Sequence, residues 1–207
     1  MRHSVLPLVV LTALTLQAAP QETKPATGQS GRTAEGDPLG SPGHEEHAKP
    51  AANVGTKAAS TPARRAFDRL KALEGTWRGK STKGWTDHAT IQVIAGGSAV
   101  VSTSDFDAHK GQTMVTVFHL DGEKLMLTHY CVAKNQPRLV ATTISEDGAN
   151  IGFTFLDGAN IPTRDTGHMD RAEYRFESSS AFTTRWSWYE KGGEKWFEEI
   201  KMERVPG

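Results

Sequence analysis

The sequence Thr-His-Tyr-Cys-Val-Ala-Lys-Asn-Gln-Pro-Arg, at residues 128–138, holds side chains of unusually varied chemistry and includes the chain's single cysteine. It combines an imidazole, a thiol, two amides and a guanidinium. Amides on a stiff loop before a proline supply hydrogen-bond donors and acceptors, and such loops often position ligands. The candidate site residues in this stretch are His129, Cys131, Asn135, Gln136 and Arg138.

One hypothesis for this stretch is a binding site for a small, partly polar molecule. Small-molecule sites are mostly apolar, with a few placed polar groups. The polar groups would come from the stretch itself and from His168, further along the chain. The apolar wall would come from aromatic residues of later segments, namely Phe153, Phe155, Tyr174, Trp186 and Trp188.

A second hypothesis is catalysis, with Cys131 as nucleophile and His129 as general base. Residues two apart on a strand are separated by about 6.5–7 Å, whereas a nucleophile and its base need contact at about 2.6–3.2 Å. His168 is an alternative base for the same thiol. The usual thiol pKa of about 8.5 also leaves a cysteine mostly protonated at neutral pH.

Two further hypotheses use the same residues differently. His129, Cys131 and His168 offer nitrogen and sulfur ligands of the kind that zinc prefers, but no carboxylate is placed as a fourth ligand. Alternatively, the amides and histidines form a self-satisfied polar plug in a filled barrel, and the protein acts as an exported interaction module. We predict no catalytic residue, no bound metal and no cofactor.

The elements that position these residues are predicted from hydrophobic period. Thr61 and Pro62 open a short helix with Phe67, Leu70 and Leu73 on one face. After Gly75 the sequence consists of short alternating runs separated by turn signals, as in an antiparallel barrel or sandwich. We predict strands at residues 76–81, 86–94, 98–105, 113–120, 124–131, 138–144, 150–156, 168–177, 181–190 and 195–204.

These strands predict an all-β fold, a closed antiparallel up-and-down barrel of about ten strands with a short N-terminal helix. Glycine pairs and Asp-Gly steps between the runs supply the positive φ of tight hairpins. Closure removes the two exposed edges of an open sheet. Alternation places His129, Cys131 and His168 on the apolar, inward face, and we expect the two imidazoles to converge inside the barrel.

The first 62 residues have a different composition. Residues 1–19 have a short basic start, an apolar run of about a dozen residues and then small residues, as in an export signal; the run is too short to span a bilayer. Residues 20–62 are rich in Pro, Gly, Ala, Thr and Ser and are predicted to be a disordered linker. We therefore expect an exported protein, periplasmic or secreted, with its barrel domain at residues 63–207.

The charge balance limits the partners. The 207 residues include 24 basic and 24 acidic side chains, so the formal net charge is +0. Nucleic acids and anionic membranes select a basic face, and this balance argues against both. One cysteine cannot form an intrachain disulfide. The predicted partner is a small-molecule ligand, with no nucleic acid and no stable membrane insertion after signal cleavage.

The segment Leu-Glu-Gly-Thr-Trp-Arg-Gly at residues 73–79 resembles the Gly-x-Trp start of lipocalin-like (calycin) barrels. The resemblance implies a helix before a first strand whose tryptophan closes the barrel floor, and a basic residue near the C-terminus over that tryptophan, here Arg204. Residues 64–207 also resemble small exported bacterial lipocalin-like proteins of unassigned function. There His129 to Cys131, Asn135 to Pro137 and Gly167 to Met169 match the expected elements.

The resemblance implies a fold and an internal cavity, and it implies no activity. Haem-binding relatives use a histidine near the C-terminal end as iron ligand, and this chain has no histidine after His168. Fatty-acid-binding relatives carry a helical lid between their first two strands. The interval between Ser81 and Thr86 is too short for such a lid.

Overall fold

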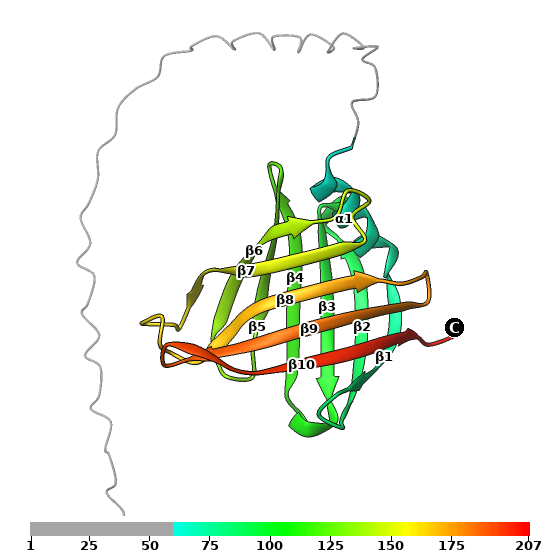
Figure 1. Ribbon diagram of the computed structural model, residues 1–207. Helices are drawn as coiled ribbons and strands as arrows, with labels where there is room; N and C mark the ends of the chain where they lie inside the picture. Colours follow the sequence, from blue (N-terminus) through cyan, green and yellow to red (C-terminus); the bar gives the residue numbers. More distant parts are fainter. Residues whose placement is uncertain (1–59) are drawn as a thin grey trace, which may run out of the picture. The chain divides into compact units, whose positions relative to one another are not determined.

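The computed structural model describes residues 60–207, which form a β-barrel preceded by one α-helix (Figure 1). Ten antiparallel strands pair in chain order, and β1 closes against β10. The predicted closed up-and-down barrel is therefore confirmed. The strands are β1 (Gly75–Ser81), β2 (Thr86–Ile94), β3 (Ala99–Phe106), β4 (Thr113–Asp121), β5 (Lys124–Tyr130), β6 (Gln136–Ile144), β7 (Asn150–Ala159), β8 (His168–Phe176), β9 (Ala181–Glu190) and β10 (Gly193–Arg204).

The predicted strands agree with the structure to within a few residues at each end. One difference is β6, which begins at Gln136, so that Gln136 and Pro137 belong to the strand and not to a loop. The ladder between β5 and β6 runs only from Met126↔Val140 to Thr128↔Arg138, so no partner on β5 needs the N–H that Pro137 lacks. The predicted export signal and residues 20–59 of the predicted linker lie outside the described residues.

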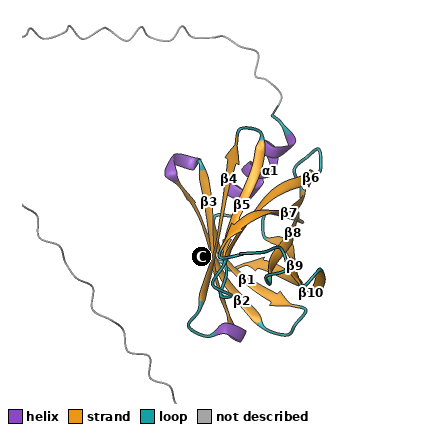
Figure 2. Cartoon of the chain, turned by 90° about the vertical axis from the view of Figure 1, so that its left-hand side faces the viewer, coloured by secondary structure: helices purple, strands orange, loops and turns teal. Residues whose placement is uncertain are grey.

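The helix α1 (Pro62–Ala72) lies where the sequence predicts it and packs against β4, β5 and β6 (Figure 2). Thr61 is its N-cap, and the Thr61 hydroxyl accepts a hydrogen bond of 3.3 Å from the Arg64 N–H. Phe67, Leu70 and Leu73 are buried, as the apolar stripe predicts. No helix between residues 60 and 207 has the length and hydrophobicity that crossing a bilayer requires.

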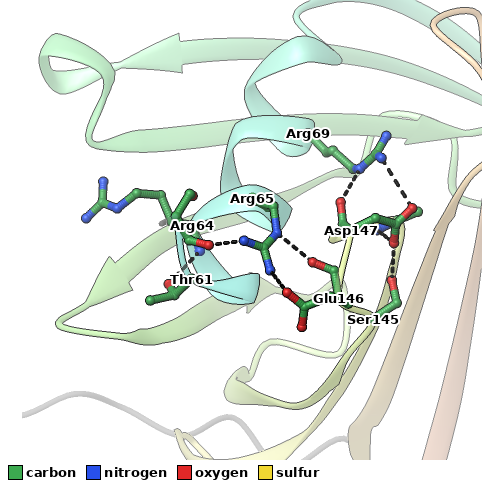
Figure 3. Close-up of polar contacts among 9 residues, drawn as sticks. Thr61, Arg64, Arg65, Arg69, Ser145, Glu146 and Asp147 are labelled. Carbon is green, nitrogen blue, oxygen red and sulfur yellow. Dashed lines mark hydrogen bonds and ion pairs between the residues drawn. The ribbon is translucent and has the colours of Figure 1, made fainter. Parts of the chain in front are cut away.

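Polar contacts attach α1 to the hairpin between β6 and β7 (Figure 3). The Arg65 guanidinium pairs with the Glu146 carboxylate and also donates to its carbonyl. Arg69 donates to the Asp147 carbonyl at 2.9 Å. A Cβ at Gly148 would lie 2.5 Å from the Ala66 nitrogen, so this glycine lets the hairpin approach the helix closely.

Trp77 on β1 and Arg204 on β10 connect the N-terminal and C-terminal parts of the barrel domain. The Arg204 guanidinium lies 4.3 Å from the centroid of the buried Trp77 ring and donates to the carbonyls of Glu74 (2.7 Å) and Ala72 (3.0 Å). Gly75 has φ +134°, and a Cβ there would meet Arg204 at 2.7 Å. The expected basic residue over the first-strand tryptophan is thus present, and the geometry explains why position 75, two residues before that tryptophan, is glycine.

Candidate functional site

A cavity of about 770 Å³ lies inside the barrel. Because the strands alternate in direction, α1 and the β2–β3, β4–β5, β6–β7 and β8–β9 connections share one end of the barrel. The other connections form the opposite end (Figure 1). Residues of three of them, among them Lys83, His109 and Val132, line the cavity and mark its mouth.

The floor of the cavity, at the α1 end, is apolar. Leu70 and Leu73 of the helix region contribute to it from the α1 side, and inward side chains of five strands complete it. These residues are almost completely buried. The strand residues that line this part are Ile91, Val100, Phe118, Phe182, Ile200 and Met202.

His129 lies in the upper wall, which is the more polar part of the cavity near its mouth. The ring Nδ1 is 2.9 Å from the Thr116 hydroxyl, and the ring centroid is 4.9 Å from that of Trp186. Burial lowers the pKa of His129 to about 4, so the imidazole is neutral at pH 7. Its Nε2 is buried and has no hydrogen-bond partner among the described residues.

Cys131 also lines the cavity, near the mouth. Burial raises the pKa of the thiol, which keeps it protonated at neutral pH. The described hydrogen bonds of the His129 side chain include Thr116 and not the thiol. The geometry therefore gives no support to the nucleophile–base hypothesis.

Three of the predicted aromatic residues line the cavity: Tyr174, Trp186 and Trp188. Trp188 stacks on Trp196 across the β9–β10 ladder, with ring centroids 5.8 Å apart and planes 2° from parallel. Burial, and the nearby Asp87, raise the pKa of the Tyr174 phenol, so that it is neutral. Phe153 and Phe155, also expected in the wall, are not among the lining residues.

Sequence reasoning missed two buried carboxyl groups, those of Asp87 on β2 and Glu198 on β10. Both line the cavity and are 4% and 8% exposed. They stand on inner faces of the two strands that flank β1, where Gly79 lies beside Asp87 and has no side chain. The signal was in the alternation, because Asp87 is in phase with Ala89 and Ile91, and Glu198 with Ile200 and Met202.

The two carboxyl groups have different surroundings. Glu198 Oε1 accepts hydrogen bonds from the Ser81 hydroxyl and from Trp85 Nε1, the latter at 2.6 Å. Asp87 Oδ2 accepts one from Ser104 at 3.3 Å, while Oδ1 is buried without a partner in the described chain. Burial raises the pKa of Asp87 to about 7, and the charges of Glu198 and Asp105 add to this shift against the lowering effect of the Ser104 hydroxyl.

The expectation that His168 meets His129 in the cavity is wrong. A β-bulge makes Asp170 an extra residue in β8, so that Met169 pairs with Trp188 while Arg171 pairs with Ser187. The extra residue reverses the inward and outward positions before it. Met169 therefore lines the cavity, and His168 does not.

His168 is instead completely buried under the β7–β8 loop. Its Nδ1–H donates to the Thr166 carbonyl at 2.5 Å, and its Nε2 accepts from the Arg164 guanidinium. The ring lies 4.3 Å from Phe155 and 5.7 Å from Tyr189. Both nitrogens are thus satisfied within the protein, and the histidine holds the loop.

Asn135, Gln136 and Arg138 do not reach the cavity either. Asn135 Nδ2 donates to the Gly167 carbonyl at 2.8 Å and so connects the β5–β6 and β7–β8 loops. Gln136 accepts from the side chain of Asn160, and the exposed Arg138 pairs with Asp157 on the neighbouring strand. These three side chains thus make contacts within the protein. The polar plug needs amides and histidines that satisfy one another, whereas Asn135 Oδ1 and His129 Nε2 are buried without partners among the described residues.

No group of three histidine, cysteine or acidic side chains within residues 60–207 is arranged to hold a metal ion. The zinc hypothesis needs His129, Cys131 and His168 together. The bulge in β8 separates His168 from the other two. The geometry therefore does not support this site.

No family model and no curated protein matches the sequence. Among solved structures, the chain is similar to Rv2717c from M. tuberculosis (13% identity, 68% of this chain and 98% of that chain, TM-score 0.48). A second is a protein of unknown function from the DUF3598 family of Nostoc punctiforme (14%, 66% and 49%, 0.44), of which this chain spans about half the length. A third is an S-type phycobiliprotein lyase from Guillardia theta (10%, 68% and 92%, 0.38).

The fold itself is that of a lipocalin-like barrel, because ten strands close in up-and-down order behind a short helix. The Gly-x-Trp segment and the arginine over its tryptophan fit that fold. The similar structures name no particular family for this chain. At such low identity and TM-score, nothing about its ligand or activity follows from them.

Proposed function

We propose that the protein binds a small, partly polar molecule inside the barrel. The observation that carries the proposal is the cavity of about 770 Å³, which has an apolar floor and a polar upper wall. Sites for small molecules are typically hollows of roughly 300–1,000 Å³ with this distribution of side chains. In the upper wall, His129 Nε2 and Asp87 Oδ1 are buried and lack partners among the described residues, and a bound molecule would satisfy them.

Binding is favoured over the alternatives by the same geometry. A filled barrel acting only through its outer surface has no use for a hollow of this size. A hydrolase would need an activated nucleophile, and burial keeps the Cys131 thiol protonated. We further propose that the protein is exported, on the strength of the signal-like residues 1–19.

Native mass spectrometry of the full chain, purified from its own host, tests the binding proposal. We expect a bound mass, and we expect uptake of the neutral fluorescent probe N-phenyl-1-naphthylamine after that mass is extracted. In the variant Ala89→Phe, a ring enters the cavity and binding falls at least tenfold.

The matched control is Thr90→Phe, which adds the same ring at the next position of β2, on the exposed outer face. Both variants are checked for a cooperative thermal transition. A bare mass, together with no probe uptake by the unmodified protein, would refute the proposal. Equal uptake by both folded variants would place binding outside the cavity.

A further inference from the structure

We propose that the ligand is an amphiphile with a protonated nitrogen group, whose apolar chain lies toward the floor of the cavity and whose cation lies between Asp87 and Glu198. This inference rests on the proposed binding function and adds the chemical class of the ligand. Three observations carry it: the uncompensated acids, their free hydrogen-bonding capacity, and the aromatic rings around them.

The charge of the wall is the first observation. Among the described lining residues, Asp87 and Glu198 are the acids, and Lys83 is the one permanently cationic side chain. Lys83 belongs to the β1–β2 turn at the mouth, and its ammonium lies 5.8 Å from the Trp196 centroid. Neither acid has an ion-pair partner within residues 60–207. A buried carboxylate without a cation is costly, so a cationic ligand is favoured and an anionic one is opposed.

The open hydrogen-bonding positions are the second observation. Asp87 Oδ1 is a buried acceptor without a donor. Glu198 presents a second carboxylate, of which the described bonds involve only Oε1. An ammonium group has three donors and no acceptor, so it supplies what these two carboxyl groups lack.

The aromatic lining is the third observation. Four of the chain's five tryptophans line this cavity: Trp85, Trp186, Trp188 and Trp196. Trp85 is directly bonded to Glu198. Tryptophan faces attract organic cations, and acids combined with aromatic rings are the usual means of binding ammonium groups. The apolar floor at the α1 end then accommodates the uncharged chain of the ligand.

Competition among three molecules with the same ten-carbon chain tests the proposal. Decylamine, decanol and decanoate are titrated at pH 8 against the full chain loaded with N-phenyl-1-naphthylamine. We expect decylamine to displace the probe at a concentration about tenfold or more below that of decanol, with decanoate weakest. Probe uptake with equal competition, or with decanoate strongest, would overturn the cationic ligand but leave binding intact. No probe uptake and no competition would overturn binding itself.

Variants locate the cation. Asp87→Asn and Glu198→Gln should each weaken decylamine by about tenfold and leave decanol unchanged. Glu199→Gln is the matched control, since Glu199 is the adjacent acid on β10 and does not line the cavity. Loss of decylamine selectivity in Glu199→Gln, or its retention in both inner variants, would contradict the assignment.

Discussion

The buried carboxyl group of Asp87 lowers the stability of the free protein at neutral pH, so stability does not account for its presence. Its side chain is 4% exposed and its pKa is raised from 3.8 to about 7. A raised carboxyl pKa means that the folded state binds the proton more tightly than the unfolded chain. The contribution of the Asp87 carboxyl group to the free energy of unfolding is therefore fully present below pH 4. It is lost as pH rises through 7, by roughly 4 kcal/mol in total. A group that destabilises the free protein at neutral pH is typical of a functional site.

We therefore expect Asp87→Asn to stabilise the protein by a few kcal/mol at pH 8 and by only about 1 kcal/mol at pH 4.5. The amide occupies the same volume and cannot ionise. Urea unfolding of the ligand-free protein at both pH values measures the difference. The control Asp121→Asn changes an exposed aspartate and should shift neither curve. A destabilised Asp87→Asn at pH 8 would mean that the carboxylate is compensated in the free protein.

His129 contributes the opposite slope. Its folded pKa of about 4 lies below the ordinary 6.5, so its contribution is present above pH 6.5 and is lost as pH falls through 4. Between pH 4 and 6.5 the two groups oppose each other. In Asp87→Asn only the His129 contribution remains, so the free energy of unfolding of this variant should fall as pH decreases from 6.5 to 4.

Two arginines fix separate elements of the barrel. Arg204 caps carbonyls at the end of α1 while its guanidinium covers Trp77, which ties the last strand to the helix. Arg164 contacts His168, pairs with Asp170 and stacks on Tyr189 at 3.8 Å from the ring centroid. The second cluster holds the β7–β8 loop at the rim, apart from the cavity.

The β7–β8 loop gives a prediction that separates His168 from binding. In His168→Ala the Arg164 guanidinium loses one of its two acceptors, the imidazole Nε2, and keeps Asp170. We expect trypsin to cleave after Arg164 several times faster than in the unmodified protein. Mass spectrometry of the fragment that begins at Asp165 measures the rate. Uptake of N-phenyl-1-naphthylamine should stay the same, because His168 does not line the cavity. A matching loss of probe uptake with unchanged cleavage would return His168 to the binding site.

At the scale of the whole barrel, one side is packed and the other is hollow. Fully buried large residues on β5, β6 and β7, among them Leu125, Leu139 and Phe153, fill the first side and do not line the cavity. On β2 and β3 the inward residues include Ala89, Ser102 and Ser104, which are small. Small side chains on the inner face leave the volume that the opposite side fills.

Export is the prediction that concerns residues 1–19. Protein recovered from the host's exported fraction should lack residues 1–19 or a closely similar length, as measured by intact mass. Leu11→Arg places a charge in the apolar run and should keep the full-length chain in the cell, while Thr27→Arg, beyond the run, should not. An uncleaved mass in the exported fraction, or normal export of Leu11→Arg, would contradict the signal.

The sequence by itself determined the architecture, because local patterns fix local structure. Alternation and turn residues predicted ten strands within a few residues of their observed bounds. The contact of Arg204 with Trp77 was implied by the resemblance of the Gly-x-Trp segment to lipocalin-like barrels. Alternation also placed His129, Cys131, Tyr174, Trp186 and Trp188 correctly on the inner face.

The tertiary structure decided which polar residues meet. One extra residue in β8 turned His168 away from the cavity, and no local pattern marks a bulge at Asp170. Arg138 forms an ion pair with Asp157 of the next strand and points away from the cavity. Asp87 and Glu198 are 111 positions apart in the sequence and line the same cavity only because β1 closes between β2 and β10. Register and closure depend on distant pairing, and a site built across them follows from the folded barrel alone.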